Sequence, residues 1–409
     1  MAPFDPRPYP LVNRIQPYAW GARGEDAFIP RLLGIAAEAD APYAEPWMGA
    51  HPSAPSQAVA DGTPVSLRQL IARRPREILG EAVAERFSGE LPFLFKVLST
   101  AEALSIQAHP TKEQARLLHA RDPEHYPDDN HKPELAVALD SLTALVGFKP
   151  FPGILETLER YPEMAGFIGA EVVASARDAR GASLQERSAR LRALYATLVE
   201  RSVAHADELV SATGRLAERL DARTAREEER LFLDMRRKYS GADAGLFTIF
   251  LLNLLHLKAG QGIFTKAGIP HAYLKGNIVE CMANSDNVVR AGLTPKFKDI
   301  ETLVDILTYE MAPPAIIEGD ADAAEVVYRT PADEFQVSRL RMQPGQERAE
   351  STGGGPQILL VTAGEAIISW EEGNAAFRRG QSVLLPAFLS GFELKATTSS
   401  EIFRVQVPL

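Results

Sequence analysis

A long stretch without proline most constrains the fold of this chain of 409 residues. Residues 163–233 contain no proline and are rich in Ala, Leu, Glu and Arg, a composition typical of helices. Ser183 followed by Glu186 has the form of a capping box, a signal for the start of a helix. Two leucine stripes at helical spacing follow, and they consist of Leu184, Leu191, Leu194 and Leu198, then Leu209, Leu216 and Leu220. We therefore expect a helical insertion that packs on itself.

The segments on either side of this insertion have β character. Short apolar runs broken by Pro and Gly fill residues 11–149, with one helix expected near 65–74. Strand character returns near Gly262, and a Pro-rich junction follows at 311–314. Beyond the junction, short β-rich runs lie at 358–361, 366–370 and 382–386. The sequence predicts a mainly β fold with an α insertion.

Composition and charge narrow the class of protein. The net charge of -10 argues against a general nucleic-acid binder, which would carry a basic stripe. The one cysteine, Cys281, allows no intrachain disulfide, and we expect it to be a small buried thiol. The start of the chain lacks the pattern of a signal peptide, and no stretch approaches the roughly 18 apolar residues of a membrane span. We expect a cytoplasmic protein without a membrane partner.

Three short segments contain most of the candidate metal-binding and catalytic residues. In Leu104–Pro110, the alternation of a strand places Ser105, Gln107 and His109 on one face. The same rule places Lys132 and Glu134 together and turns His131 away, and a third segment supplies His271.

Two imidazoles, one carboxylate and one amide oxygen form a plausible ligand set for Zn²⁺, which accepts N and O ligands. The spacing is a weak signal because neither HExxH nor CxxC occurs. For Leu104–Pro110 taken alone, an ordinary exposed polar strand face remains the alternative.

Several longer runs resemble one enzyme family. They are IQPYAWG, PYAEPWMGAHPSAPS, LPFLFKVLSTAEALSIQAHP, YPDDNHKPELAVAL, ALVGFKP, GIPHAYLKG and IVECMANSDNVVRAGLTPKFKD. In this order they resemble the hallmark segments of the type I mannose-6-phosphate isomerase (phosphomannose isomerase) family, part of the cupin superfamily. The resemblance implies a zinc-dependent enzyme that interconverts mannose 6-phosphate and fructose 6-phosphate through a cis-enediol, with one Zn²⁺ per chain. Its zinc ligands fall on Gln107, His109, Glu134 and His271.

The resemblance also implies a domain organisation. We expect two cupin-type jelly-roll β-barrels plus a helical domain. The expected units are a discontinuous catalytic barrel (1–152 and 256–312), a helical insertion (153–255) and a C-terminal barrel (313–409). The segment after His271 contains no histidine, so the C-terminal barrel is expected to be metal-free. The family likeness further suggests a monomer.

Catalytic roles follow from the resemblance for Arg290 and from side-chain chemistry for the candidate bases. Arg290 matches the family's active-site arginine, and its permanently charged guanidinium suits the stabilisation of negative charge. Lys132 is the first candidate for proton transfer and Glu280 is its rival; the sequence does not separate them. For the sugar phosphate, the resemblance indicates Lys96, Ser105 and Lys296 near the phosphate and Trp20 as a stacking wall.

Three positions depart from the family pattern. Ala19 stands where Asp is usual, and Lys266 and Ile269 stand where Pro and Glu are common.

Two alternative functions stay open. They are a cupin that holds Fe(II) for dioxygen chemistry and a non-catalytic sugar-phosphate sensor. Gln107 and the cluster of Lys and Arg argue against the first, and the presence of Arg290 and Lys132 argues against the second.

Overall fold

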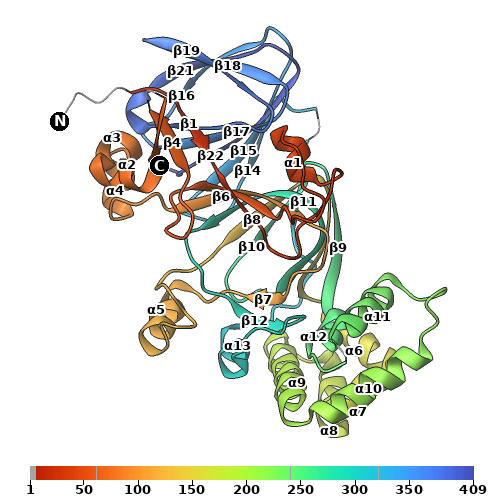
Figure 1. The fold of residues 1–409 in the computed structure, drawn as a ribbon. Helices are drawn as coiled ribbons and strands as arrows, with labels where there is room; N and C mark the ends of the chain where they lie inside the picture. Colours follow the sequence, from red (N-terminus) through yellow and green to blue (C-terminus); the bar gives the residue numbers. More distant parts are fainter. Residues whose placement is uncertain (1–5, 61, 240, 321) are drawn as a thin grey trace.

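The computed structural model describes residues 6–60, 62–239, 241–320 and 322–409. Strands and helices alternate from the start, and the long helices cluster between residues 151 and 239. In Figure 1 these helices lie at one end of the molecule, the strands of the C-terminal part lie at the other, and a large sheet lies between them. The mainly β class with helices is confirmed; the division into two barrels and a helical domain stays a proposal.

The central sheet has ten strands, with β13, β10, β8, β11, β6, β3 and β2 side by side. Strand β9 pairs with β8, while β7 pairs with both β11 and β12. The strands are β2 (Arg14–Gln16), β3 (Glu45–Gly49), β6 (Phe93–Thr100), β7 (Ile106–Ala108), β8 (Glu134–Phe148), β9 (Leu252–Lys258), β10 (Gly262–Thr265), β11 (His271–Ala283), β12 (Val289–Gly292) and β13 (Ile316–Ile317). The expected strand at 104–110 is therefore present, but shorter than the sequence suggested.

An eight-stranded sheet combines the two ends of the chain. The N-terminal strand β1 pairs with β20 near the C-terminus, in the register Pro10 opposite Val383. The sheet runs through β14 (Glu325–Tyr328), β15 (Gln336–Met342), β22 (Ser400–Gln406), β17 (Gln357–Ala363), β20 (Ser382–Leu385), β1 (Tyr9–Val12), β4 (Gln57–Ala60) and β5 (Thr63–Ser66). A four-stranded sheet lies beside it, with β16 (Glu347–Ser351), β21 (Gly391–Ala396), β18 (Glu365–Trp370) and β19 (Gly373–Arg378).

Helices connect the strands at many places along the chain. They are α1 (Phe28–Leu33), α2 (Leu67–Arg73), α3 (Pro75–Leu79), α4 (Glu81–Arg86), α5 (Lys112–Arg121), α6 (Phe151–Arg160), α7 (Pro162–Ile168), α8 (Ala170–Asp178), α9 (Leu184–Ala204), α10 (Ala206–Arg219), α11 (Glu227–Tyr239), α12 (Gly245–Thr248) and α13 (Ile300–Ile306). Short 3₁₀ turns occur at η1 (Ala179–Gly181), η2 (Ile249–Leu251) and η3 (Ala387–Leu389). The helix expected near 65–74 is α2, preceded by the short strand β5.

The capping box at the start of α9 is confirmed. The Ser183 side chain accepts a hydrogen bond from the Glu186 N–H, and the Glu186 carboxylate accepts one from the Ser183 N–H. Leu191 is buried as its stripe requires, but Leu184 is 72% exposed. Leu184 lies in the helix as expected, at the first position of α9.

Strand alternation explains why the central sheet has two different faces. On β6, Phe93, Phe95 and Val97 belong to a core shared with residues of the eight-stranded sheet such as Ile358 and Val405. The even-numbered residues of β6 point to the other face. This second face, called the inner face below, is mostly apolar, and it carries the charged residue Lys96 in the middle of the strand. The same inner face supplies the candidate site.

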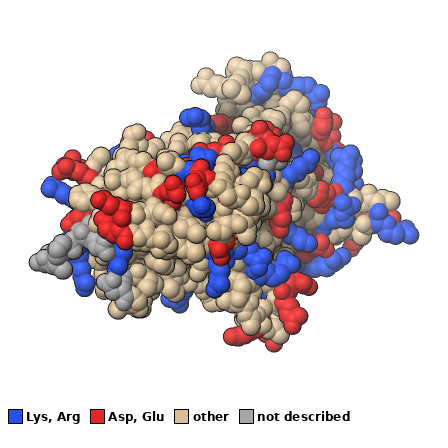
Figure 2. Space-filling model, turned by 90° about the horizontal axis from the view of Figure 1, so that it is seen from above, with Lys and Arg blue, Asp and Glu red and all other residues tan. Residues whose placement is uncertain are grey.

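The surface visible in Figure 2 carries charged side chains of both signs. On the side seen in Figure 2, Lys and Arg side chains lie among Asp and Glu side chains. Within the described residues, no helix combines the length and the apolar character that spanning a membrane requires.

Candidate metal centre and active site

His109, Glu134 and His271 meet inside the central sheet. His109 directly follows β7, Glu134 begins β8 and His271 begins β11. One potential ligand atom from each of the three buried residues lies within 4.8 Å of the others. His109 Nε2 is 3.3 Å from Glu134 Oε1, and His271 Nε2 is 3.2 Å from Glu134 Oε2. The three side chains thus converge although 162 positions separate the first from the last in the sequence.

Backbone carbonyls fix the orientation of both imidazoles. His109 Nδ1 is 2.8 Å from the Asn287 carbonyl oxygen, and His271 Nδ1 is 3.0 Å from the Ile269 carbonyl oxygen. A carbonyl can only accept, so each Nδ1 carries the proton and each Nε2 presents a lone pair to the cluster. Both Nε2 atoms are buried without a hydrogen bond of acceptable geometry, as is Glu134 Oε2. Buried polar atoms without partners that point at one another are the arrangement a bound metal ion satisfies.

The protonation states of Glu134 and His109 also favour the binding of a metal ion. Burial raises the pKa of the Glu134 carboxyl, but His109 and Lys132 outweigh burial and hold this pKa well below its usual range. Burial lowers the pKa of His109, which favours the neutral ring. An ionised carboxylate with a neutral imidazole is the form in which these groups bind a divalent cation.

The register of β7 brings Gln107 and Arg290 to the same place. Gln107 is paired with His271 on one side and with Arg290 of β12 on the other. Directly paired residues on neighbouring strands project to the same face of a sheet with their Cβ atoms about 4.5–5.5 Å apart. Gln107 is half-buried between the two, and burial lowers the pKa of Arg290. The fourth expected ligand and the expected catalytic arginine are therefore neighbours of the cluster in the sheet.

A second charged cluster lies along the same face. Lys96 of β6 is paired in register with Glu280 of β11, and Lys96 Nζ is 2.7 Å from Glu280 Oε2. Glu45 Oε2 is 3.7 Å from the same ammonium, and Trp47 donates a hydrogen bond of 2.6 Å to Glu45. Burial opposes the charge of Lys96, but Glu280 and Glu45 outweigh it and raise the pKa of Lys96 far above its usual value. Lys96 therefore holds its positive charge between two buried carboxylates.

Lys132 and His131 point in opposite directions, as the alternation of side chains along an extended segment predicts. Lys132 Nζ is 3.3 Å from Glu134 Oε1, next to the cluster. His131 Nε2 is 2.6 Å from Glu334 Oε1, a residue that precedes β15 in the C-terminal part of the chain. Lys132 is thus on the side of the candidate metal centre, and His131 is on the side of the C-terminal strands.

The remaining expected substrate residues are more dispersed. Trp20 packs partly against the apolar cluster that contains Tyr273, and its ring stacks on Tyr18 with 5.6 Å between the centroids. Ser105 is half-buried immediately before β7. Lys296 is exposed in the loop after β12, and its described hydrogen bond is made by its backbone N–H to Thr294. The structure brings Lys96 into the site cluster, but it gives no contact between Lys296 and that cluster among the described residues.

Sequence reasoning missed three residues of this region. Glu45 and Trp47 flank Lys96, and Tyr273 lies with its ring centroid 6.2 Å from that of His271. The Tyr273 hydroxyl is buried without a hydrogen-bond partner, and burial followed by Glu280 raises its pKa well above 10. Alternation could have found them, because Glu45 and Trp47 are two residues apart, as are His271 and Tyr273.

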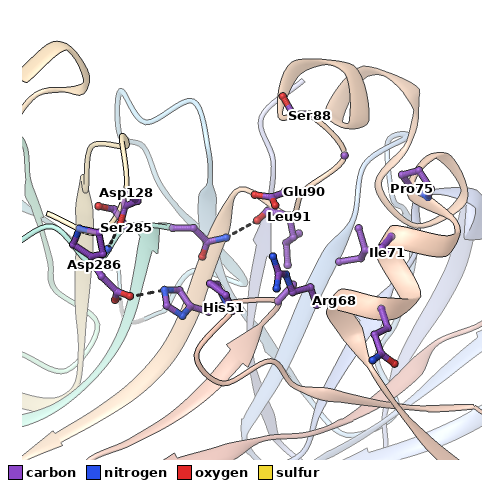
Figure 3. Close-up of a pocket in the computed structure, with 17 residues that line it drawn as sticks. His51, Arg68, Ile71, Pro75, Ser88, Glu90, Leu91, Asp128, Ser285 and Asp286 are labelled. Carbon is purple, nitrogen blue, oxygen red and sulfur yellow. Dashed lines mark hydrogen bonds and ion pairs between the residues drawn. The ribbon is translucent and has the colours of Figure 1, made fainter. Parts of the chain in front are cut away.

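A separate hollow of about 750 Å³ opens beside this region. Figure 3 shows its lining, with His51 and Asp286 on one side and Arg68 and Glu90 on the other. His51 Nε2 is 3.5 Å from Asp286 Oδ1, and its ring meets Trp47 edge-on at 5.0 Å. None of the three residues of the buried cluster lines this hollow. The chemistry of the site therefore belongs to the buried cluster, because the ligand-type atoms converge there.

The fold and the cluster define a mainly β protein built around a candidate metal centre, and comparisons identify its family. The family model for the catalytic domain of type I phosphomannose isomerase matches residues 9–151. Mannose-6-phosphate isomerase from Mus musculus is 37% identical over 98% of this chain and 96% of its own. The Homo sapiens enzyme of that name is 42% identical over 89% of each chain. The chain therefore belongs to the type I mannose-6-phosphate isomerase family, and it is an isomerase.

Solved structures agree with this assignment. A mutant of phosphomannose isomerase from Salmonella typhimurium superposes with a TM-score of 0.86, at 33% identity, over 98% of this chain and 100% of that chain. A mannose 6-phosphate isomerase bound with zinc and yttrium superposes with a TM-score of 0.84 at the same identity and coverage. The zinc in the second structure and the His–Glu–His cluster found here both point to a metal.

Proposed function

We propose that the chain is a zinc-dependent aldose-ketose isomerase that interconverts mannose 6-phosphate and fructose 6-phosphate through a cis-enediol intermediate. The convergence of three unpartnered ligand-type atoms of His109, Glu134 and His271 in a buried site carries this proposal. These three residues, with Gln107, hold one Zn²⁺ per chain. The family membership supplies the substrate class, and the charged residues around the cluster supply the groups that the reaction needs.

The reaction moves one proton between two carbons. A base removes the proton from C2 of open-chain mannose 6-phosphate and returns it to C1, while a proton also leaves O2 and another is gained at O1. When bound, Zn²⁺ acts as a Lewis acid that polarises sugar oxygens. Arg290 stabilises the negative charge that develops on the oxygens of the enediolate, because its guanidinium stays protonated.

Lys132 is the proposed proton carrier, and Glu280 is its rival. Lys132 Nζ lies 3.3 Å from Glu134 at the candidate metal centre. Glu280 is paired in register with Lys96, and its carboxylate is already engaged by the Lys96 ammonium at 2.7 Å. For the rest of the substrate, we propose Ser105, Lys96 and Lys296 as partners of the phosphate and Trp20 as a wall for the sugar.

Removing the metal tests the reaction and the cofactor together. Fructose 6-phosphate formation from mannose 6-phosphate is measured in a coupled assay on the protein as purified, after chelation, and after zinc is added back. We expect activity to vanish with the chelator and to return with zinc. Absence of turnover with zinc demonstrably bound would show that this substrate is wrong, and oxygen consumption in the iron-loaded protein would favour the dioxygenase alternative.

A pair of matched variants separates the two candidate bases. Lys132→Met removes the amine and Glu280→Gln removes the charge, each at nearly constant size. A general base contributes about 10²- to 10⁴-fold, so we expect Lys132→Met to lower kcat by at least about 10²-fold. The variant that lacks the base should also lose the exchange of solvent deuterium into C1 and C2 of the sugar, measured by NMR. A greater loss of exchange in Glu280→Gln would transfer the role to Glu280.

A further inference from the structure

Arg290 is held in place by its strand and not by its side chain. Over the part of the chain that the structure describes, its guanidinium has no hydrogen bond or ion pair with another residue, and burial alone perturbs its pKa. Its strand β12 is four residues long and pairs with β7, with a register shift between Arg290 and Gly292. The position of Arg290 therefore depends on how the end of β12 is anchored.

One buried carboxylate anchors that end. Asp243 Oδ1 accepts a hydrogen bond of 2.7 Å from the N–H of Leu293, the residue after β12. Oδ2 of the same carboxylate accepts a 3.4 Å bond from the N–H of Thr294 and lies 3.1 Å from Lys298 Nζ. Asp243 is 4% exposed and precedes α12, so it comes from the chain that follows the long helices.

The backbone at this anchor is tightly constrained. Leu293 has φ of 54°, a left-handed conformation that non-glycine residues seldom adopt and that surrounding contacts must maintain. Asp243 Oδ1 also accepts a 2.7 Å hydrogen bond from the N–H of Gly245. A Cβ on Gly245 would lie 2.5 Å from Leu293 N, and one on Gly292 would lie 2.4 Å from Gly245 Cα. The Asp243 carboxylate thus joins two backbone segments that only glycine allows to approach so closely.

We propose that Asp243 is a positioning residue for Arg290. By fixing Leu293, three residues further along the chain, its carboxylate sets the end of β12 and with it the direction from which the guanidinium reaches the reacting oxygens. The segment beside the helical insertion thereby contributes to catalysis without touching substrate. This inference rests on the catalytic role of Arg290 in the proposed function. Displacements of about 1 Å at a reacting group can cost about 10²-fold in rate, so a small shift of β12 is enough to matter.

A double-mutant cycle with Arg290 tests this role. We expect Asp243→Ala to lower kcat for mannose 6-phosphate by about 10- to 100-fold, with KM and bound zinc little changed. In the Arg290→Ala background the same substitution should lower kcat no further, because the residue it positions is gone. Asp243→Asn keeps an oxygen for the Leu293 and Gly245 N–H groups and should lose only about threefold, again only when Arg290 is present. Asp305→Ala, which removes an exposed ion pair of 2.7 Å between α13 and Arg192 of α9, is the matched control and should leave kcat unchanged.

The outcomes separate this inference from the function on which it rests. An equal loss of kcat in both backgrounds would reduce Asp243 to a general structural residue, and an unchanged kcat in Asp243→Ala would overturn the inference directly. If Asp243→Ala does not fold, the Asp243→Asn cycle decides, and an unchanged kcat there also overturns it. If Arg290→Ala itself leaves kcat unchanged, the proposed role of Arg290 is wrong, and the inference falls with it.

Discussion

Replacing Glu134 with Gln is expected to lower kcat/KM for mannose 6-phosphate by about 10³-fold or more, or roughly 4 kcal/mol of transition-state stabilisation. The substitution keeps the size of the side chain but removes the negative charge that lies 3.3 Å from His109 Nε2 and 3.2 Å from His271 Nε2. Without that charge the two neutral imidazoles bind a divalent cation more weakly. Bound zinc, measured by elemental analysis, should fall in parallel with activity.

The matched control is a Glu to Gln change at an ion pair far from the site. Glu163 of α7 accepts two hydrogen bonds from Arg219 of α10, at 2.6 and 2.8 Å, between two helices of the insertion. Glu163→Gln should therefore affect stability slightly and leave zinc content and kcat/KM unchanged. If Glu134→Gln kept both its zinc and its activity, the proposed metal centre would be wrong.

The directions of the Lys132 and His131 side chains could be predicted from the sequence alone, by the alternation of side chains along an extended segment. This alternation predicted that Lys132 points toward Glu134 and that His131 points away. In the structure, Lys132 Nζ is 3.3 Å from Glu134, and His131 is 2.6 Å from Glu334. The two residues precede β8, which begins at Glu134, and their opposite directions follow the alternation that an extended backbone imposes on successive side chains. The expected buried thiol at Cys281 is likewise confirmed, since this residue is 1% exposed and burial raises its pKa.

Contacts between distant segments were beyond the sequence. The partner of His131 is 203 residues away, and β1 pairs with β20 across nearly the whole chain. Local propensity and periodicity describe a strand but not its neighbour, which depends on how the complete sheets pack. The division into domains, with a catalytic unit that begins at residue 1, remains a proposal.

The departures from the family pattern fall where the structure can accommodate them. Ile269 contributes its backbone carbonyl to His271 Nδ1, at 3.0 Å, so its side chain can change without loss of this hydrogen bond. Lys266 forms an exposed ion pair of 2.8 Å with Glu310. Ala19 leaves the adjacent Trp20 stacked on Tyr18. These three substitutions therefore give no structural reason to doubt the isomerase reaction.

Replacing Arg290 with Ala is expected to lower kcat by about 10²- to 10³-fold, the usual cost of removing a donor that stabilises a developing oxyanion. Arg290 is paired in register with Gln107, whose other neighbour is His271, so its side chain starts on the face that carries the metal centre. Its guanidinium has no partner among the described residues and is desolvated, which leaves its charge available to the substrate. Bound zinc should stay unchanged, because Arg290 is not a ligand.

The form of the loss distinguishes charge stabilisation from simple binding. Arg290→Lys keeps the positive charge but replaces the planar fork of donors, and it should recover only part of the activity. If Arg290 acts mainly in the transition state, kcat and kcat/KM fall together in Arg290→Ala; a rise in KM at constant kcat would mean that it only binds the substrate. Steady-state kinetics on the wild type and both variants, at equal zinc content, decides between these roles.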